Sequence, residues 1–404
     1  MRSAALTVLV ACAAQAAPNP ATVPAAAPNP ATASNPAAAP NPAAAPNPAA
    51  APNPAPAPNP AAAPNPAAAP NPAAAPNPAT APNPAGPPAA DSCVDDGAPY
   101  DVTALRVRVA HLASVELDGR ASGSPGDVAA RAYIAERFRC LGLVPGGDHG
   151  YEQTFSIGRG ADRRTTANLI GYLAGADSSD ADADAAHGHD AAHDAGRGGD
   201  IIVVGAHHDH LGDGHLGAND DASGVAALLA IAQAVHQHGT PHRTIAFVAF
   251  GGEELGELGS TYYAAHPPAA LPLDRVVYDV NLDMVGSYRA AGAVYAMGTF
   301  PGLAGTELTR ALAGEHRALK IATGGRGEGS DHEAFCTAGV PYVFFWTPDK
   351  RCYHARCDTA DRLDADHAAA IAEVAGALVE RLAASPRDLA GLRARLGCSG
   401  RGPR

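Results

Sequence analysis

One segment, from Ile201 to Gly224 (IIVVGAHHDHLGDGHLGANDDASG), limits the fold more strongly than any other part of the chain. It opens with β-branched residues and then changes to glycine and polar residues, which is typical of a buried strand. The strand is expected to end near Gly205, so that His207 and Asp209 come at its carboxyl end. In open α/β sheets, ligands bind at this edge. The segment therefore predicts an α/β fold with a polar site at the end of a strand.

Other apolar segments also end in acidic residues or histidine. Asp220 precedes a nearly continuous apolar run from Ala222 to Val235, which predicts a helix with most of its surface buried. Buried strands are expected over 243–250, 276–285 and 341–346. Glu253 and Glu254 follow the first of these, Asp283 lies within the second, and His354 follows the third. A further strand is expected over 165–173, and helices over 101–111, 127–141 and 366–384. The chain thus places histidine and carboxylate groups at the ends of several separate strands.

These side chains fit a metal site better than they fit a nucleophilic hydrolase. Carboxylate and imidazole ligands suit Zn²⁺ or, less specifically, Mn²⁺ or Co²⁺. No cysteine pair has the C-x-x-C spacing of a thiolate zinc site, and Ser223 lacks the G-x-S-x-G pattern of a hydrolase elbow. The H-E-x-x-H pattern of single-zinc proteases is also absent from the sequence. The formal net charge of −13 argues against a nucleic-acid partner.

Residues 1–17 have the pattern of an export signal. They carry one positive charge, at Arg2, then a short apolar stretch and small residues. The apolar stretch is far shorter than the roughly 20 residues that a transmembrane helix needs. Two processing routes remain open, because Leu9 to Cys12 resembles a lipobox whose cysteine is lipidated, whereas Ala14-Gln15-Ala16 suits soluble secretion. We therefore expect an exported protein that is secreted, periplasmic or held at the cell envelope by a lipid anchor.

Residues 18–90 repeat units such as AAAPNP and are expected to form a disordered tether. Each proline disfavours helix at the preceding residue and favours extended polyproline II, and the repeat has no apolar face to stack. A folded catalytic domain is expected over 91–404. Within it, residues 176–200 alternate alanine with aspartate and histidine and lack core-forming side chains. We expect a solvated, disordered loop there, and loose metal binding is the alternative.

Six motifs, taken in order, resemble the co-catalytic two-zinc aminopeptidases of clan MH, of the aminopeptidase S and aminopeptidase Y type. The motifs are GAHHDHLG, GANDDASG, GGEELGELGS, NLDMVG, GSDHEAF and CYHARCDT, and the resemblance extends from about 101 to 384. The chain is most similar to secreted bacterial leucine-type aminopeptidases. The resemblance implies a mixed, mostly parallel central sheet flanked by helices, the phosphorylase/hydrolase-like fold, and two Zn²⁺ per chain.

The resemblance also implies a role for individual residues. The metal ligands would be His207 and Asp283 for one zinc, Glu254 and His354 for the other, and Asp220 as the bridge between them. Glu253 would be the general base, Asp209 would orient His207, and Tyr353 would donate a hydrogen bond to the oxyanion. The residues Ser330, Asp331 and His332 would shape the site without binding metal. The remaining histidines of the first motif, His208, His210 and His215, match no family role and are expected to be polar loop residues.

In the relatives that the sequence resembles, a small disulfide loop carries the last motif. A Cys352–Cys357 bridge around Tyr353 and His354 is therefore expected. The pairing of the other cysteines stays open, namely that of Cys93, Cys140, Cys336 and Cys398.

The resemblance implies hydrolysis of the first residue from peptides with a free N-terminus, and we expect that residue to be hydrophobic. A monomer is the expected oligomeric state. A carboxypeptidase or amidohydrolase of the same fold is one alternative. A glutaminyl cyclase is another, although that group has a Trp-His-Thr pattern where this chain has Tyr353 and His354. A non-catalytic receptor-like domain is least favoured, because such a domain is expected to have lost ligands and none is lost here.

Overall fold

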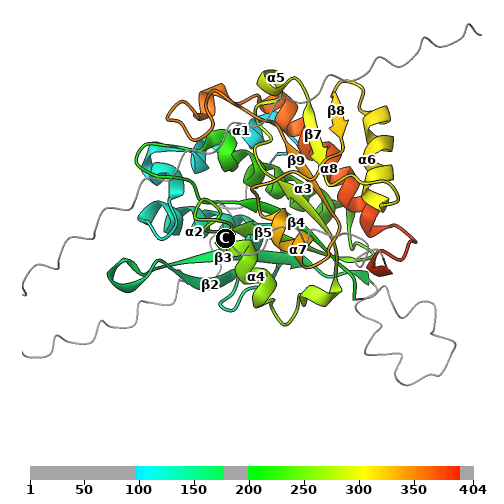
Figure 1. The fold of residues 1–404 in the computed structure, drawn as a ribbon, viewed down its shortest axis with the longest axis horizontal. Coiled ribbons are helices and arrows are strands. Elements are labelled where there is room, and N and C mark those ends of the chain that lie inside the picture. Colours follow the sequence, from blue (N-terminus) through cyan, green and yellow to red (C-terminus); the bar gives the residue numbers. More distant parts are fainter. Residues whose placement is uncertain (1–96, 177–198, 392–404) are drawn as a thin grey trace, which may run out of the picture. The chain divides into compact units, whose positions relative to one another are not determined.

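The computed structural model describes residues 97–176 and 199–391 (Figure 1). The predicted export signal, Cys12, the tether and nearly all of the 176–200 loop lie outside the described residues. No helix within the described ranges is long and apolar enough to cross a membrane.

The described part of the chain contains a mixed sheet flanked by helices, as expected. The strands are β1 (Val144–Pro145), β2 (Glu152–Ile157), β3 (Arg164–Leu173), β4 (Ile201–His207), β5 (Thr244–Phe250), β6 (Val276–Leu282), β7 (Val294–Met297), β8 (Ile321–Thr323) and β9 (Tyr342–Trp346). The helices are α1 (Val102–Leu112), α2 (Pro125–Cys140), α3 (Ser223–His238), α4 (Leu258–Ala265), α5 (Tyr288–Ala291), α6 (Ala304–Glu315), α7 (His332–Thr337) and α8 (Ala365–Ala383). Short 3₁₀ turns lie at Val115–Arg120, Gly160–Asp162, Leu273–Arg275 and Ala360–Arg362, and a turn of π-helix at Ala218–Ala222 precedes α3.

The sheet has the strand order β1-β3-β5-β4-β6-β9-β7-β8, with β2 also paired to β3. The four central strands, β5, β4, β6 and β9, are parallel. On one side of these strands, β3 pairs antiparallel with β5, and on the other side β7 pairs antiparallel with β9. Parallel pairing therefore dominates the centre of the sheet, and antiparallel pairing dominates the β1–β3 side. Because the central strands run in one direction, their carboxyl ends meet at one edge of the sheet.

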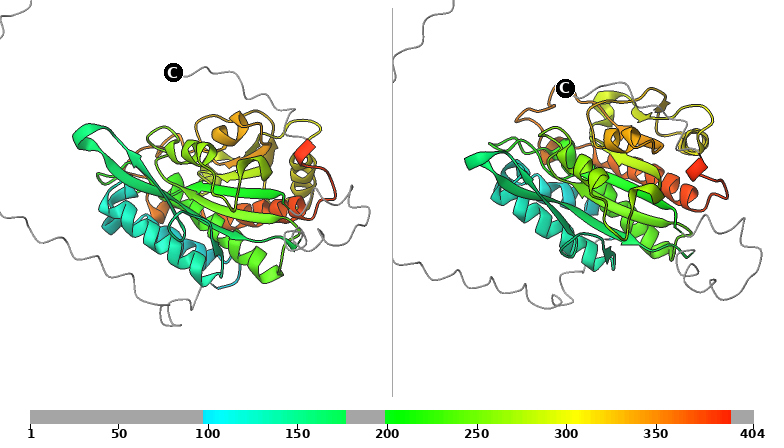
Figure 2. Two further views of the ribbon diagram at one scale, coloured as in Figure 1. Left: turned by 90° about the horizontal axis from the view of Figure 1, so that it is seen from below. Right: turned by 60° about the horizontal axis from the view of Figure 1, so that its bottom comes forward.

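The central strands β4 and β5 are buried along their whole length. Since successive side chains point to opposite faces, both faces of these strands are buried. In β4, Ile202 and Val204 belong to a core shared with α1, α2, α3 and α8, whereas Val203 belongs to a second core. Tyr263 of α4 and Phe335 of α7 complete that second core. Figure 2 shows the sheet between these two helical layers. Covering on both faces explains why these strands are continuous apolar runs in the sequence.

The elements expected from sequence patterns are present, and their ends lie within a few residues of the expected ones.

The residues at the two ends of α2 explain where this helix begins and ends. The side chain of Ser124 accepts a hydrogen bond from the backbone N–H of Asp127 at 3.1 Å, and Pro125 occupies the first turn. Gly142 lies just beyond the helix with a φ of +66°, which favours glycine at a helix end.

Candidate metal centre

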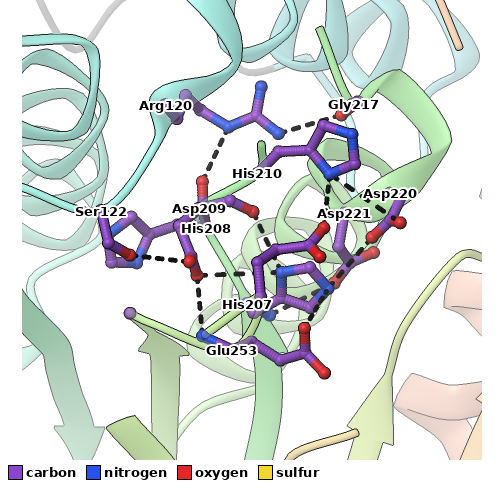
Figure 3. A network of polar contacts seen from close by, with 12 residues as sticks. Arg120, Ser122, His207, His208, Asp209, His210, Gly217, Asp220, Asp221 and Glu253 are labelled. Carbon is purple, nitrogen blue, oxygen red and sulfur yellow. Dashed lines mark hydrogen bonds and ion pairs between the residues drawn. The ribbon is translucent and has the colours of Figure 1, made fainter. Parts of the chain in front are cut away.

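The polar residues predicted from the sequence meet at the carboxyl edge of the four parallel strands. His207 is the last residue of β4, and Asp283 directly follows β6. Glu253 and Glu254 lie in the loop after β5, and Asp220 lies in the π-helical turn before α3. His354 comes from the segment after β9. Figure 3 shows His207, Asp220 and Glu253 directed toward one another. Parallel strands therefore bring together groups that are far apart in the sequence.

A first group of donor atoms surrounds Nε2 of His207. This nitrogen lies 3.2 Å from Oδ1 of Asp220 and 3.5 Å from Oδ1 of Asp283. All three residues are buried. Burial by itself would lower the pKa of His207, but the surrounding carboxylates, Glu253 and Asp283 foremost, raise this pKa well above its usual value. A cluster this rich in negative charge favours a cation at its centre.

A second group lies on the other side of Asp220. Its Oδ2 atom is 3.2 Å from Nε2 of His354 and 3.8 Å from Nδ1 of His210. The Oε2 atom of Glu254 lies 3.1 Å from Nε2 of His354, and its Oε1 atom lies 2.6 Å from Nδ1 of His210. Asp220 therefore presents one oxygen to each group.

These two groups have the composition and spacing of metal sites. In each of two triads, one ligand atom per residue lies within 4.8 Å of the others; the triads are His207, Asp220 and Asp283, and His210, Asp220 and Glu254. Several of the oxygens are buried and accept no hydrogen bond from the described residues, namely Asp220 Oδ2, Glu254 Oε1 and Asp283 Oδ1. Buried polar atoms without partners are costly, so a bound cation would account for them. Imidazole and carboxylate donors fit Zn²⁺.

Asp209 was expected to orient His207, and it does so through its backbone carbonyl and not through its carboxylate. The Nδ1–H of His207 donates to the backbone carbonyl of Asp209 at 3.1 Å, whereas the nearer carboxylate oxygen is 4.0 Å away. That carboxylate instead accepts from the hydroxyl of Ser122 at 2.7 Å and from the backbone N–H of Glu253 at 3.1 Å. The backbone of Asp209 orients the ring, and its side chain holds the loop of Glu253. Because the carbonyl fixes the proton on Nδ1, Nε2 is left free to bind.

Two carboxylates that sequence reasoning missed hold the loop of Asp220. Asp358 accepts hydrogen bonds from the backbone N–H groups of Asn219 at 2.8 Å and Asp220 at 3.0 Å. Burial and the charge of Asp220 raise the pKa of Asp358 to about 6, against the opposing effect of these hydrogen bonds. Asp221 accepts from the N–H groups of His207 and Met284 at 3.2 and 3.0 Å, and so joins the ends of β4 and β6. Both residues lie within quoted motifs, Asp221 in GANDDASG and Asp358 in CYHARCDT, and this was the available signal.

Arg120 is a third missed residue, and no pattern around it indicates its role. Its guanidinium is fully buried and donates to the carbonyl of His208 at 2.7 Å, of Leu216 at 2.8 Å and of Gly217 at 2.9 Å. Figure 3 shows it above the loop that follows β4. These hydrogen bonds hold in place the loop that connects His207 to Asp220.

The expectation that the extra histidines of the first motif are ordinary polar loop residues is wrong for two of them. His208 and His210 are buried, and only His215 is partly exposed. The Nε2 atom of His208 lies 2.9 Å from Oδ1 of Asp127 and so ties the loop to α2. His210 lies within the second donor group. An H-H-D-H run gives no local signal of burial, because its environment is supplied by distant segments.

The disulfide expected between Cys352 and Cys357 is present, and it closes the loop that carries Tyr353 and His354. The ring of Tyr353 stacks on that of His354, with the centroids 3.8 Å apart, and its side chain is 54% exposed. Partial burial and the nearby carboxylates raise the pKa of Tyr353, so its hydroxyl keeps its proton. His332 lies outside both donor groups and stacks on Phe344, with the centroids 4.5 Å apart.

A cavity of about 350 Å³ opens over both donor groups. Its polar lining includes His207, Asp220, Glu253, Asp283 and His354. Apolar side chains line another part of it, from Met284, Phe344, Trp346 and Pro348. The cavity therefore has room for a small group beside the candidate metal centre.

Curated relatives match part of the chain. The chain is 32% identical to "Leupeptin-inactivating enzyme 1" of Streptomyces exfoliatus over 191 residues, which are 41% of this chain and 42% of that protein. It is 37% identical to "Aminopeptidase YwaD" of Bacillus subtilis (strain 168) over 153 residues, 36% of this chain and 32% of that protein. The matches thus span less than half the length of these relatives.

Solved structures share the fold. An aminopeptidase from Aneurinibacillus sp. strain AM-1 superposes with a TM-score of 0.56 at 20% identity, over 72% of this chain and 96% of that chain. Porphyromonas gingivalis glutaminyl cyclase superposes with a TM-score of 0.54 at 19% identity, over 70% and 99%. Residues 191–379 match Peptidase family M28, and they include every residue of the two donor groups. The chain therefore contains a domain of peptidase family M28.

Proposed function

We propose that this protein is an exported zinc-dependent aminopeptidase that holds two Zn²⁺ and removes a hydrophobic N-terminal residue from peptides. The observation that carries the proposal is the position of Asp220 between two donor groups, one oxygen facing His207 and the other facing His354. Asp220 would bridge the ions, with His207 and Asp283 completing one site and Glu254 and His354 belonging to the other. Zinc bound there would polarise the scissile carbonyl and acidify the attacking water.

Glu253 is the proposed general base. It belongs to neither donor group, and its Oε2 atom lies 4.0 Å from Nε2 of His207, at the edge of the cavity. Burial raises the pKa of Glu253 to about 10. The charges of Asp283 and Asp331 also raise this pKa, whereas the charge of His207 lowers it. Cations bound to the neighbouring carboxylates would lower this pKa, because they offset those negative charges. The deprotonated carboxylate then takes a proton from the attacking water and delivers it to the leaving amine.

Tyr353 is the proposed donor to the carbonyl oxygen as negative charge develops there. Its hydroxyl keeps its proton, and its ring lines the cavity next to His354. A preorganised donor at this position stabilises the transition state more than the ground state.

The shape and charge of the cavity support the substrate class. Its apolar lining, from Met284, Phe344 and Trp346, suits a hydrophobic side chain. Its volume of about 350 Å³ matches a small group better than a folded chain. The carboxylates in its lining suit a protonated α-amine. A free N-terminus would therefore be recognised by charge and the first side chain by apolar contact.

Hydrolysis of a panel of aminoacyl-4-nitroanilides, beside N-acetylated controls and with and without added zinc, tests this proposal. We expect cleavage of leucine-type substrates, no cleavage of acetylated ones, and loss of activity in a chelator that zinc restores. Equal cleavage of acetylated substrates would instead support a carboxypeptidase or amidohydrolase.

Glutaminyl cyclase is the second candidate, because a structure of that name shares the fold. The second donor group, around Glu254 and His354, favours the two-metal peptidase, because a cyclase of the resembled kind uses one metal. Incubation with peptides that begin with glutamine separates the two. Loss of ammonia without cleavage would support the cyclase.

Export and anchoring are a separate part of the proposal. The sequence pattern around Cys12 supports a lipid anchor, and residues 18–90 support a spacer between that anchor and the catalytic domain. Cys12→Ala in a producing bacterium should move the protein from the membrane fraction to the soluble exported fraction. An unchanged distribution would favour the soluble-secretion route. A monomer is expected in solution, which light scattering measures.

A further inference from the structure

His210 occupies an unusual position for a residue outside the recognised ligand pattern. Its side chain is 1% exposed, although it follows β4 in a loop. The Nδ1 atom lies 2.6 Å from Oε1 of Glu254 and 3.8 Å from Oδ2 of Asp220. The ring therefore reaches the second donor group from the interior, on a different side from His354, whose ring centroid is 5.7 Å away.

Nδ1 of His210 and Oε1 of Glu254 form an ion-pair contact at 2.6 Å. Neither ring nitrogen of His210 has a hydrogen-bond partner among the described residues, nor do Oε1 of Glu254 and Oδ2 of Asp220. A buried imidazole normally satisfies both nitrogens, and buried carboxylate oxygens normally accept hydrogen bonds. A buried ring nitrogen and two buried carboxylate oxygens that converge in this way form a group that a shared cation would satisfy.

The surrounding loop holds the ring of His210 in place. Arg120 donates to carbonyls on both sides of it, those of His208 and Gly217. Gly217 has a φ of +61°, and a Cβ built there would stand 2.5 Å from Cγ of His210. Figure 3 shows the ring beside Gly217 and directed toward Asp220. Because the backbone packs directly against the ring, His210 has little freedom to turn away from the donor group.

We propose that Nδ1 of His210 is a ligand of the second metal ion, together with Asp220 and Glu254. The inference rests on the metal centre of the proposed function and adds a ligand to it. Its consequence is that this ion has three buried protein ligands without His354, whose side chain is 36% exposed on the disulfide-closed loop. Loss of His354 then removes the exposed ligand and leaves the three buried ones. Loss of His210 removes one of the three buried ligands.

Metal titration of the full chain tests this proposal. Cobalt binding to the metal-free protein is followed by calorimetry and by visible absorption, for the unmodified chain, His210→Ala and His215→Ala. We expect His210→Ala to weaken one of two binding events by roughly 100-fold or more, because removal of even a supporting group costs about 10–100-fold. His215→Ala is the matched control, since His215 lies in the same loop, belongs to neither triad and contacts the carbonyl of Gly212 at 3.0 Å.

A measurement on the unmodified chain keeps the test independent of whether the variant folds. In cadmium-substituted protein with isotope-labelled histidine, one-bond cadmium–nitrogen couplings should appear for three rings, those of His207, His210 and His354. Couplings from two rings alone, or unchanged cobalt affinity in a folded His210→Ala protein, would overturn the assignment. If the unmodified chain binds no metal, the proposed function fails together with this inference. If it binds two ions and His210→Ala binds them equally well, only this inference fails.

Discussion

The Nε2 atom of His354 lies 3.2 Å from Oδ2 of Asp220, and this contact joins the disulfide-closed loop to the turn that precedes α3. His354 has a φ of +52°, in the left-handed region that residues with a Cβ seldom adopt. Asp358, which lies just beyond the disulfide, accepts the backbone N–H of Asp220 at 3.0 Å. The loop therefore contacts Asp220 through its side chain and through its backbone.

The Cys352→Ser/Cys357→Ser double variant should lose metal affinity and kcat more than it loses thermal stability. A bridge that closes so short a loop removes little chain entropy from the unfolded state, so its main effect is to keep Tyr353 and His354 in position. We expect a small fall in Tm and a clear fall in zinc affinity, measured by calorimetry. Alkylation of either cysteine in the native, unreduced protein would contradict the role given to the bridge.

Glu253→Gln should retain two zinc ions and lose about 10²–10⁴ in kcat, because it removes the proposed base and no proposed ligand. Metal content by elemental analysis, together with kcat, measures both effects. Glu254→Gln is the matched control, one residue away, and should lose metal as well as activity. If the two variants show the opposite pattern, the roles of the adjacent carboxylates are exchanged.

Asp220→Asn should weaken both metal sites, because one of its oxygens faces each donor group. The amide keeps the shape of the side chain and removes its negative charge. Asp283 faces the first donor group alone, so Asp283→Asn should impair a single metal site. Zinc titration of the two variants distinguishes these outcomes. A bridging role is excluded if Asp220→Asn still binds two ions as tightly as the unmodified chain.

Asp127→Asn should lower stability at neutral pH and have little effect in acid. Burial would raise the pKa of Asp127, but its hydrogen bond to His208 and the charges of His208 and Arg131 outweigh burial and lower it. A folded-state pKa below the unfolded value means that the carboxylate stabilises the fold above about pH 4. This stabilisation is lost as the pH falls through the folded value.

Denaturant unfolding of the metal-free protein measures this effect without a contribution from metal release. We expect Asp127→Asn to lower the free energy of unfolding by about 2 kcal/mol at pH 7, and the difference to shrink below about pH 4. Asp213→Asn is the control, since its side chain is 90% exposed in a surface pair with Arg356. A difference that stays constant over this pH range would exclude the ionised carboxylate as its source.

The sequence by itself determined the local elements and the identity of most donor residues. The apolar runs of β4, β5, β6 and β9 and the long apolar helices α3 and α8 are recognisable because burial on both faces leaves a continuous hydrophobic pattern. The order of the motifs placed His207, Asp220 and Glu253 at strand ends and helix starts. The disulfide around His354 also followed from the resemblance, and the bridge is present.

Only the tertiary structure decided how these groups face one another. The backbone of Asp209, and not its carboxylate, accepts from His207, because the carboxylate is taken by Ser122 and Glu253. His210 is buried in a loop whose backbone carbonyls accept hydrogen bonds from Arg120, and any residue could supply such carbonyls. Hydrogen bonds to backbone atoms of distant segments leave no local pattern in a sequence, so such contacts appear only when the chain is folded.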